Sequence, residues 1–280
     1  MTELLAGSFG LPAVSCTDLA TGRTTVTVYF QAKPDWSLAT RAGLSAGLDR
    51  ISRCGLDVGA RKVELRKVRP EDWAKSWKRH FRPIEIGPKL LIRPSWSRHR
   101  ARRGQAVVVL DPGLSFGTGQ HPTTGFCLKQ LAGRRRAGAA QSFLDIGTGS
   151  GVLAIAAAKL GYAPIEAFDF DPEAVRTARA NAQRNHVLAR IRFRQQDLTK
   201  LPCQNDKQYS VICANLVANL LVEEQKRILA RLAKGGLLVL AGILKTEFRR
   251  VEKAYEHEGL ALLAARTEAE WRSGIFLKDF

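Results

Sequence analysis

The segment Phe143–Gly151, FLDIGTGSG, constrains the fold of this chain more than any other. Apolar residues surround one acid, and three glycines follow at alternate positions. The Ala-rich run Val152–Gly161 that comes next is typical of a buried helix. Glycine lets the backbone adopt φ > 0 or approach a ligand closely, and a helix N-terminus offers unpaired N–H groups. The segment therefore predicts a strand, a tight turn and a helix that together hold a nucleotide-like ligand.

The spacing of the glycines narrows the choice of ligand. Gly147, Gly149 and Gly151 form G-x-G-x-G, whereas dinucleotide-binding turns have G-x-G-x-x-G. Asp169 lies 22 residues after the first glycine, at the end of the next apolar strand, where an acid can bind ribose hydroxyls or, alternatively, cap the next helix. Asp145, just before the turn, suits a ligand that carries an ammonium group; the alternative is a structural hydrogen-bonding residue within the loop. These features favour S-adenosylmethionine over NAD or FAD; the alternative is an ordinary strand–helix turn without a ligand.

Strands and helices alternate through the rest of the chain. The pattern predicts strands over 107–111, 165–170, 191–195, 209–214, 237–241, 261–265 and 274–277, and helices over 125–131, 172–184, 217–233 and 245–258. This alternation is typical of a mostly parallel sheet with helices on both faces, in which ligands bind at the carboxyl ends of the strands. Gly147, Asp169, Asp197 and Asn215 all fall at such ends. We therefore expect them to meet at one site.

Asn215 is the candidate catalytic residue. Its side-chain carbonyl is able to hold an incoming amine. It lies in Ala-Asn-Leu-Val rather than in Asn-Pro-Pro-aromatic, the motif that clamps a flat nucleobase, so an aliphatic amine fits better. Asp197 either contacts the adenine amino group or simply ends its strand. Methyl transfer from a sulfonium requires alignment and exclusion of water, but no metal or covalent nucleophile, and the sequence offers neither.

The segment Asp111–Thr124, DPGLSFGTGQHPTT, is too rich in Gly and Pro to form a regular element. It leads into the predicted helix over 125–131, for which Thr123 or Thr124 is a candidate N-cap. We expect this loop to fold over the ligand cleft. Within it, His121 is either a functional residue or a structural hydrogen-bonding residue.

The first 66 residues have a different character. Predicted strands over 24–31 and 62–68 flank a predicted helix over 37–54, which indicates a small α+β domain for recognition, docking or scaffolding. Trp73 and Trp77, four residues apart, are typical of core or interface packing on a helix. The predicted organisation is a small domain over 1–66, a linker and connecting segment over 67–106, and a catalytic domain over 107–280.

Composition limits the environment and the partners. The chain has no apolar run long enough to span a membrane, and its N-terminus is a poor signal peptide. Five cysteines without a C-x-x-C pair argue against a zinc site or a disulfide framework and indicate the cytoplasm. The net charge of +18 includes basic clusters at Arg98–Arg103 and Arg134–Arg136. These clusters either contact RNA or acidic surfaces, or belong to solvated loops.

The chain resembles the bacterial methyltransferases of ribosomal protein L11, the PrmA family. The resemblance extends from about Glu71 to the C-terminus. The loop over 110–124 is the most specific part, whereas the glycine turn alone marks only the superfamily. The segments that carry the resemblance are EDWAKSWKRHFRPIEIGPKLLIRPSW (71–96), LDPGLSFGTGQHPTT (110–124), LDIGTGSGVLAIAA (144–157), DFDPEAV (169–175), ANL (214–216) and GGLLVLAGIL (235–244).

The resemblance implies a class I S-adenosylmethionine-dependent methyltransferase, with a Rossmann-like, seven-stranded, mostly parallel sheet. It implies cofactor contacts at Thr124, Gly147, Asp169 and Asn215. The implied activity is methylation of lysine ε-amines, and of the N-terminal α-amine, of ribosomal protein L11, either free or on the large subunit. The N-terminal domain would recognise this substrate and move through the linker. The alternatives are lysine methylation of another protein, RNA methylation, and a non-catalytic module that docks on the ribosome.

Overall fold

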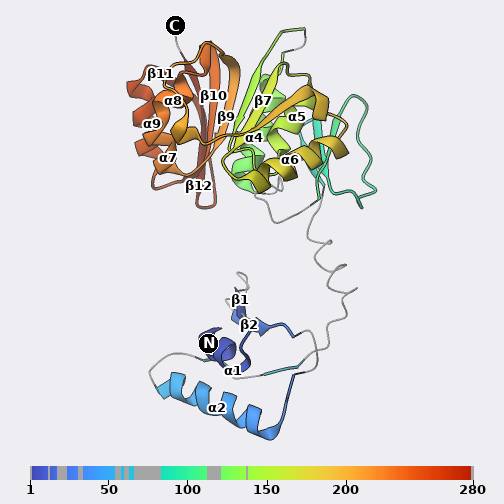
Figure 1. Ribbon diagram of the computed structural model, residues 1–280, viewed down its shortest axis with the longest axis vertical. Coiled ribbons are helices and arrows are strands. Elements are labelled where there is room, and N and C mark those ends of the chain that lie inside the picture. Colours follow the sequence, from blue (N-terminus) through green and yellow to red (C-terminus); the bar gives the residue numbers. More distant parts are fainter. Residues whose placement is uncertain are drawn as a thin grey trace. The chain divides into compact units, whose positions relative to one another are not determined.

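The computed structural model describes residues 2–11, 13–17, 24–30, 34–53, 58–59, 63–65, 83–111, 121–136 and 138–278. The chain divides into two compact units, residues 1–69 and 70–280, each of which is described by itself (Figure 1). Trp73, Trp77 and positions 112–120 of the loop before the first helix of the second unit lie outside the described residues.

The first unit contains a helix α1 (Thr2–Phe9), an antiparallel pair β1 (Ala13–Thr17) and β2 (Thr24–Val28), and a helix α2 (Leu38–Arg53). The structure confirms the strand predicted from residue 24 and the helix predicted over 37–54. Residues 63–65, the described part of the strand predicted over 62–68, are not in a strand. Leu44 and Leu48 of α2 are buried.

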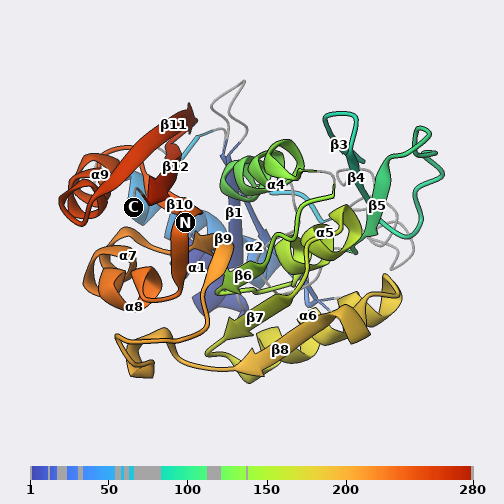
Figure 2. The ribbon, with the colours of Figure 1, turned by 90° about the horizontal axis from the view of Figure 1, so that it is seen from above.

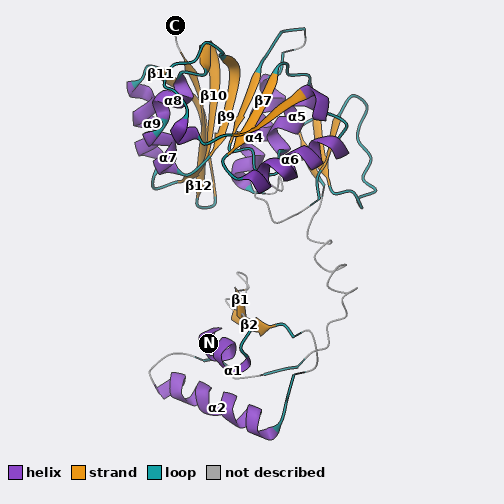
Figure 3. Ribbon diagram, viewed as in Figure 1, coloured by secondary structure: helices purple, strands orange, loops and turns teal. Residues whose placement is uncertain are grey.

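The second unit is built on a seven-stranded sheet (Figure 3). Five of the seven strands, β10, β9, β6, β7 and β8, are parallel to one another. Strand β12 is antiparallel to both of its neighbours, β10 and β11. This confirms the predicted seven-stranded, mostly parallel sheet. In spatial order the strands are β11 (Leu260–Glu268), β12 (Trp271–Lys278), β10 (Leu232–Leu244), β9 (Tyr209–Asn215), β6 (Phe143–Ile146), β7 (Ile165–Asp169) and β8 (Ile191–Gln195).

Helices cover the sheet on two faces, as Figure 2 shows. Side chains alternate between the two faces along each strand. One group of helices therefore packs with Phe143 and Ile165, and a second group packs with Leu144 and Phe168 on the opposite face. The first group is α4 (Pro122–Arg134), α5 (Val152–Leu160) and α6 (Pro172–Arg184), and the second is α7 (Ala218–Glu223), α8 (Gln225–Leu229) and α9 (Phe248–His257).

A small second sheet lies beside α4 and α5. Its strands are β3 (Ile84–Ile86), β4 (Leu90–Arg93) and β5 (Ala106–Val109), with β3 antiparallel and β5 parallel to β4. Buried Leu90 and Val108 join the core formed by α4 and α5. The predicted boundary at 66/67 stays a prediction because residues 66–82 lie outside the described ranges, and so does that at 106/107, which falls within β5.

In the second unit, two predicted helices towards the C-terminus differ from the structure. The single helix predicted over 217–233 is two short helices, since the backbone leaves the helical region at Glu224, with φ −101° and ψ 13°. Its last residues instead open β10, which passes through a bulge where Gly235 adopts φ 66°. The helix predicted from residue 245 begins at Phe248. Among the helices that the structure describes, none has the length and apolarity to cross a membrane.

Candidate functional site

The glycine turn joins the carboxyl end of β6 to the start of α5. Gly147, Gly149 and Gly151 have φ values of 71°, 53° and 82°, in the left-handed region that favours glycine. A Cβ on Gly151 would lie 2.9 Å from the Ala178 Cβ of α6. The turn therefore needs glycine for its backbone conformation and, at Gly151, for the close approach of two helices.

Asp145 stabilises this turn through hydrogen bonds. Its side chain is buried, and its Oδ2 accepts hydrogen bonds from the Thr148 hydroxyl at 2.7 Å and the Ala154 backbone N–H at 3.2 Å. Its Oδ1 is buried and has no hydrogen-bond partner among the described residues. Burial raises the pKa of Asp145 to about 7, although both hydrogen bonds act to lower it. The structure thus places Asp145 where it fixes the conformation of the turn.

Asp169 ends β7 and faces the turn. Its Oδ2 accepts a hydrogen bond from the Gly149 backbone N–H at 2.9 Å, and its Oδ1 accepts one from the Asp171 N–H at 3.1 Å. A carboxylate has about four lone-pair sites, so each oxygen retains an acceptor site. Asp171, two residues later, is the N-cap of α6 and accepts from the Glu173 N–H at 2.8 Å. The two neighbouring acids thus have separate structural roles.

Asp197 follows the end of β8. Its Oδ1 accepts hydrogen bonds from the Thr199 hydroxyl at 2.8 Å and the Thr199 backbone N–H at 3.0 Å, so it caps a short 3₁₀ turn over Leu198–Lys200. These hydrogen bonds, with the nearby charge of Lys200, hold the pKa of Asp197 below its usual value. Asp197 is therefore an ionised acceptor at neutral pH.

Asn215 ends β9 and faces the first turn of α4. Its Nδ2 lies 3.5 Å from the Thr124 hydroxyl, to which it donates a long hydrogen bond, whereas its Oδ1 is buried without a partner among the described residues. The neighbouring strand β10 passes very close: a Cβ on Gly242 would lie 3.0 Å from the Asn215 Oδ1 and 2.6 Å from the Leu216 carbonyl oxygen. The amide is thus confined, with an unused acceptor.

A pocket at the carboxyl edge of the sheet brings most of these residues together. This carboxyl-edge pocket encloses about 850 Å³, including the part open to solvent. Six of the eight predicted site residues line it, whereas Asp145 and Gly151 lie outside its lining. Its lining is formed by Thr124, Ile146, Gly147, Thr148, Gly149, Val152, Leu153, Phe168, Asp169, Phe170, Gln196, Asp197, Asn215, Leu216, Leu220 and Leu198.

The apolar walls of this pocket were not predicted from the sequence. Phe170 lines the pocket although it is 73% exposed. The tripeptide Asp169–Asp171, with an aromatic residue between two acids, was the signal that could have identified it. Leu216 and Leu220 follow the catalytic candidate Asn215 and line the pocket beside it. The walls therefore combine a few polar groups with a larger apolar surface, as ligand pockets commonly do.

His121 lies at the start of α4. This helix begins at Pro122, which places Thr123 and Thr124 in its first turn and makes His121 its N-cap, so neither threonine is the cap. The His121 Nδ1 lies 2.7 Å from the Thr123 hydroxyl, and the imidazole contacts the Trp271 ring edge-on, with ring centres 5.0 Å apart. His121 thus links the end of the loop to β12.

Comparison with known proteins places the chain in a family. A family model described as "Ribosomal protein L11 methyltransferase (PrmA)" matches residues 11–278. The protein named "Ribosomal protein L11 methyltransferase" from Trichlorobacter lovleyi is 45% identical over 206 residues, 72% of this chain and 66% of that protein. The namesake from Geobacter metallireducens is 39% identical over 248 residues, 88% of this chain and 79% of that protein.

A solved structure agrees with these sequence matches. The crystal structure of ribosomal protein L11 methylase from Lactobacillus delbrueckii subsp. bulgaricus matches with a TM-score of 0.63 at 26% identity, and covers 71% of this chain and all of that one. The matched segment spans just under two thirds of the Trichlorobacter protein. The fold is thus that of a class I S-adenosylmethionine-dependent methyltransferase, and S-adenosylmethionine is the cofactor of such enzymes. This chain belongs to the ribosomal protein L11 methyltransferase (PrmA) family.

Proposed function

We propose that this chain methylates ribosomal protein L11, transferring methyl groups from S-adenosylmethionine to lysine ε-amines and to the N-terminal α-amine. The observation that carries the choice of an amine is the Asn215 Oδ1, a buried acceptor without a partner among the described residues, at the wall of the carboxyl-edge pocket. An unpaired buried acceptor is costly, and an amine N–H is the kind of donor that would satisfy it. L11 as the acceptor protein is supported by the names of the relatives.

The carboxyl-edge pocket fits S-adenosylmethionine. Asp169 retains acceptor sites for ribose hydroxyls, and Gly147 and Gly149 present a backbone without side chains to the pocket. Asp197, ionised and half-exposed, lines the same pocket and would accept a hydrogen bond from the adenine amino group. When bound, the cofactor supplies a methyl group already activated by the sulfonium. For Asp145, which lies outside the pocket lining, we propose that it holds the glycine turn through Thr148 and Ala154 rather than contacting the ligand.

The residues around Asn215 would position the acceptor amine. A lysine attacks only as the neutral amine, and the apolar side chains of Leu216 and Leu220 beside Asn215 disfavour the charged ammonium. An N–H donated to the Asn215 Oδ1 would then fix the direction of the nitrogen lone pair. Alignment of this kind contributes a large part of the rate in transfer reactions. Thr124, through its contact with the Asn215 Nδ2, would hold the amide in place.

The proposed setting is the cytoplasm, where ribosomal proteins are synthesised. The net charge of +18 also supports contact with ribosomal RNA during the reaction. The same charge favours one competing function, methylation of RNA itself. The lack of an Asn-Pro-Pro-aromatic motif around Asn215 argues against an adenine-N6 target.

Transfer of label separates these functions. The protein is incubated with methyl-labelled S-adenosylmethionine and either free L11 or intact ribosomes, and protein and RNA are then separated. We expect label in L11, released as methylated lysine after acid hydrolysis. Label found only in RNA would contradict the proposal, and label in a different ribosomal protein would change the substrate but keep the chemistry.

A further inference from the structure

A second pocket lies next to the carboxyl-edge pocket, on the face of the sheet that packs with α7, α8 and α9. Along β8 the sequence Ile-Arg-Phe-Arg alternates, so that Ile191 and Phe193 pack with α6 in the core while Arg192 and Arg194 point to the opposite face. On that face the segment 196–208, rather than an α-helix, lies beside β7 and β8 in the described structure (Figure 2). The arginines of β8 therefore line a pocket instead of a helix interface.

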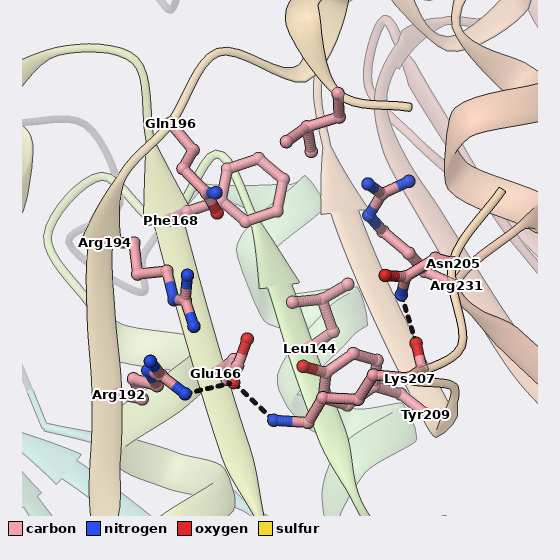
Figure 4. Close-up of a pocket in the computed structure, with 11 residues that line it drawn as sticks. Leu144, Glu166, Phe168, Arg192, Arg194, Gln196, Asn205, Lys207, Tyr209 and Arg231 are labelled. Carbon is pink, nitrogen blue, oxygen red and sulfur yellow. Dashed lines mark hydrogen bonds and ion pairs between the residues drawn. The ribbon is translucent and has the colours of Figure 1, made fainter. Parts of the chain in front are cut away.

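This cationic pocket has an unbalanced charge. Figure 4 shows its lining, which encloses about 530 Å³ including the part open to solvent. Four cationic side chains face one carboxylate, that of Glu166. The rest of the wall is formed by three polar residues and three apolar ones: Gln196, Asn205, Tyr209, Leu144, Phe168 and Leu201. The cationic residues are Arg192, Arg194, Lys207 and Arg231.

The single carboxylate is already fully engaged. Glu166 forms an ion pair with Lys207 and another, at 3.7 Å, with Arg192, and it accepts a hydrogen bond from the Tyr209 hydroxyl. Burial raises the pKa of Glu166, but the hydrogen bonds from Lys207 and Tyr209 outweigh this effect and hold it below its usual value. Glu166 is thus charged and forms ion pairs with two of the four cations; the charge of Arg194 also acts on it, but Arg194 and Arg231 form no ion pair with it.

Those two arginines have no carboxylate partner in the part of the chain that the structure describes. The Arg194 Nε is buried and makes no hydrogen bond there. Arg231 is only 6% exposed, and its guanidinium donates to the backbone carbonyls of Pro202 at 3.1 Å and Arg227 at 2.6 Å. Removing a guanidinium from water without a counter-charge is costly, so an anion in this pocket would relieve an existing cost.

We propose that the cationic pocket binds a phosphate group. Figure 4 shows Arg194 on the β8 side of the pocket and Arg231 on the opposite side, with the Phe168 ring drawn between them. A tetrahedral phosphate presents oxygens to both sides at once, whereas a planar carboxylate presents two oxygens to one donor fork. The phosphate can belong to an RNA backbone or to a small phosphate compound. The proposal is independent of amine methylation and is tested without measuring methyl transfer.

Diphosphate is the first probe. The full-length protein is titrated with sodium diphosphate in a calorimeter at constant ionic strength, alongside Arg194→Gln and Arg179→Gln. Arg179 is exposed on α6, on the other side of the sheet, so its variant loses the same charge away from the pocket. We expect Arg194→Gln to weaken diphosphate binding by about tenfold or more, which corresponds to the loss of one hydrogen bond to a charged group. Arg179→Gln should bind like the wild type.

A second variant and a fold control keep this test decisive. Lys207→Gln removes a half-exposed cation of the same pocket and should also weaken diphosphate binding. Affinity for S-adenosylmethionine, measured on each variant, reports whether the fold is intact. Equal weakening by Arg194→Gln and Arg179→Gln, or no binding of diphosphate by the wild type, would overturn the proposal. So would an acidic peptide that binds with the Arg194 dependence while diphosphate does not.

Competition identifies the source of the phosphate. If the source is RNA, a short single-stranded oligonucleotide should bind, lose affinity in Arg194→Gln but not in Arg179→Gln, and be displaced by diphosphate. If the source is a small phosphate compound, diphosphate should bind with the same Arg194 dependence and the oligonucleotide should not compete. Oligonucleotide binding that both variants reduce equally would show attraction to overall charge only, and would contradict an RNA site in this pocket.

Discussion

The carboxyl-edge pocket and the cationic pocket share two wall residues, Phe168 and Gln196, yet they are built on different principles. The first is formed where parallel strands end, by turns that expose backbone and by side chains with unused acceptors. The second is formed on one face of the sheet, by side chains of β7 and β8 that point to that face and that no α-helix covers in the described structure. The strand ends thus provide acceptors for a donor-rich ligand, whereas the strand face provides donors for an anion.

The difference shows where function can vary within one fold. Turns such as that over 147–151 depend on backbone geometry, so few sequences are compatible with them. The face of β8 tolerates almost any side chain that water or a loop can cover. A cationic pocket can therefore be added at Arg192 and Arg194 without disturbing the glycine turn. The two sites should respond independently to substitution, and the following variants test this.

The largest effect is expected at the end of β9. Asn215→Ala removes the acceptor proposed to align the amine and should lower kcat by about a hundredfold, a loss typical of misaligned reactants. Diphosphate binding should not change. The matched control is Asn219→Ala. Asn219 is an exposed residue of α7, four positions later in the chain, and this variant should keep full activity. Normal turnover by Asn215→Ala would rule out this role.

The glycine turn should be the next most sensitive position. Gly151→Ala combines a left-handed φ with a clash at Ala178, whereas Gly104→Ala has a similar φ of 80° and nothing within 4 Å. We expect Gly151→Ala to lower the free energy of unfolding by about 1–3 kcal/mol more than Gly104→Ala does, because it overpacks two helices. Urea denaturation measures the difference. Equal losses would mean that only backbone strain matters at Gly151.

Substitution of Asp169 should weaken the binding of S-adenosylmethionine but not that of diphosphate. Asp169→Asn replaces a charged acceptor and should weaken the binding of S-adenosylmethionine by about tenfold, roughly the value of one hydrogen bond to a charged group. Calorimetry measures this affinity. Asp171→Asn is the control, since asparagine also caps helices well. If Asp169→Asn changed diphosphate binding as strongly as cofactor binding, the two pockets would not be independent.

The last prediction is a pH dependence of stability caused by Asp145. Because burial raises the pKa of Asp145 to about 7, the folded state retains a proton that the unfolded chain loses near pH 4. Its contribution to stability is therefore complete below about pH 4 and decreases as the pH rises towards 7, by at most about 1.4 kcal/mol per pH unit.

Asp145→Asn should remove this part of the pH dependence. The measurement is urea denaturation of the ligand-free protein at several pH values between 4 and 7. The wild type should lose stability relative to Asp145→Asn as the pH rises. A constant difference between the two proteins over this range would contradict the raised pKa.

The two pockets also differ in how far the sequence predicts them. G-x-G-x-G, Asp169 and Asn215 identified the carboxyl-edge pocket because each lies at a strand end, and strand ends follow from local patterns. Phe170 and Leu220 were missed because apolar wall residues resemble ordinary core residues in sequence. For Asp145 the sequence left two interpretations open, contact with a ligand ammonium and structural hydrogen bonding, because local spacing does not show that Thr148 and Ala154 donate to it.

The cationic pocket was not predicted, although the net charge was noted. Arg194 and Arg231 are far apart in sequence and line the same pocket only because of the order of the strands in the sheet. The Arg98–Arg103 and Arg134–Arg136 runs, which were noted from the sequence, contribute nothing to the lining of this pocket. The parallel sheet itself was predictable from alternation, whereas the break at Glu224 and the bulge at Gly235 depend on tertiary context.

Mass spectrometry of L11 after reaction tests the central claim most directly. L11 is incubated with S-adenosylmethionine and the wild type, Asn215→Ala or Asn219→Ala, and its modified residues are mapped. The account predicts methyl groups on lysine side chains or the N-terminal amine with the wild type and Asn219→Ala, and far fewer with Asn215→Ala. Unmodified L11 in the wild-type reaction, or equal methylation by Asn215→Ala, would contradict it.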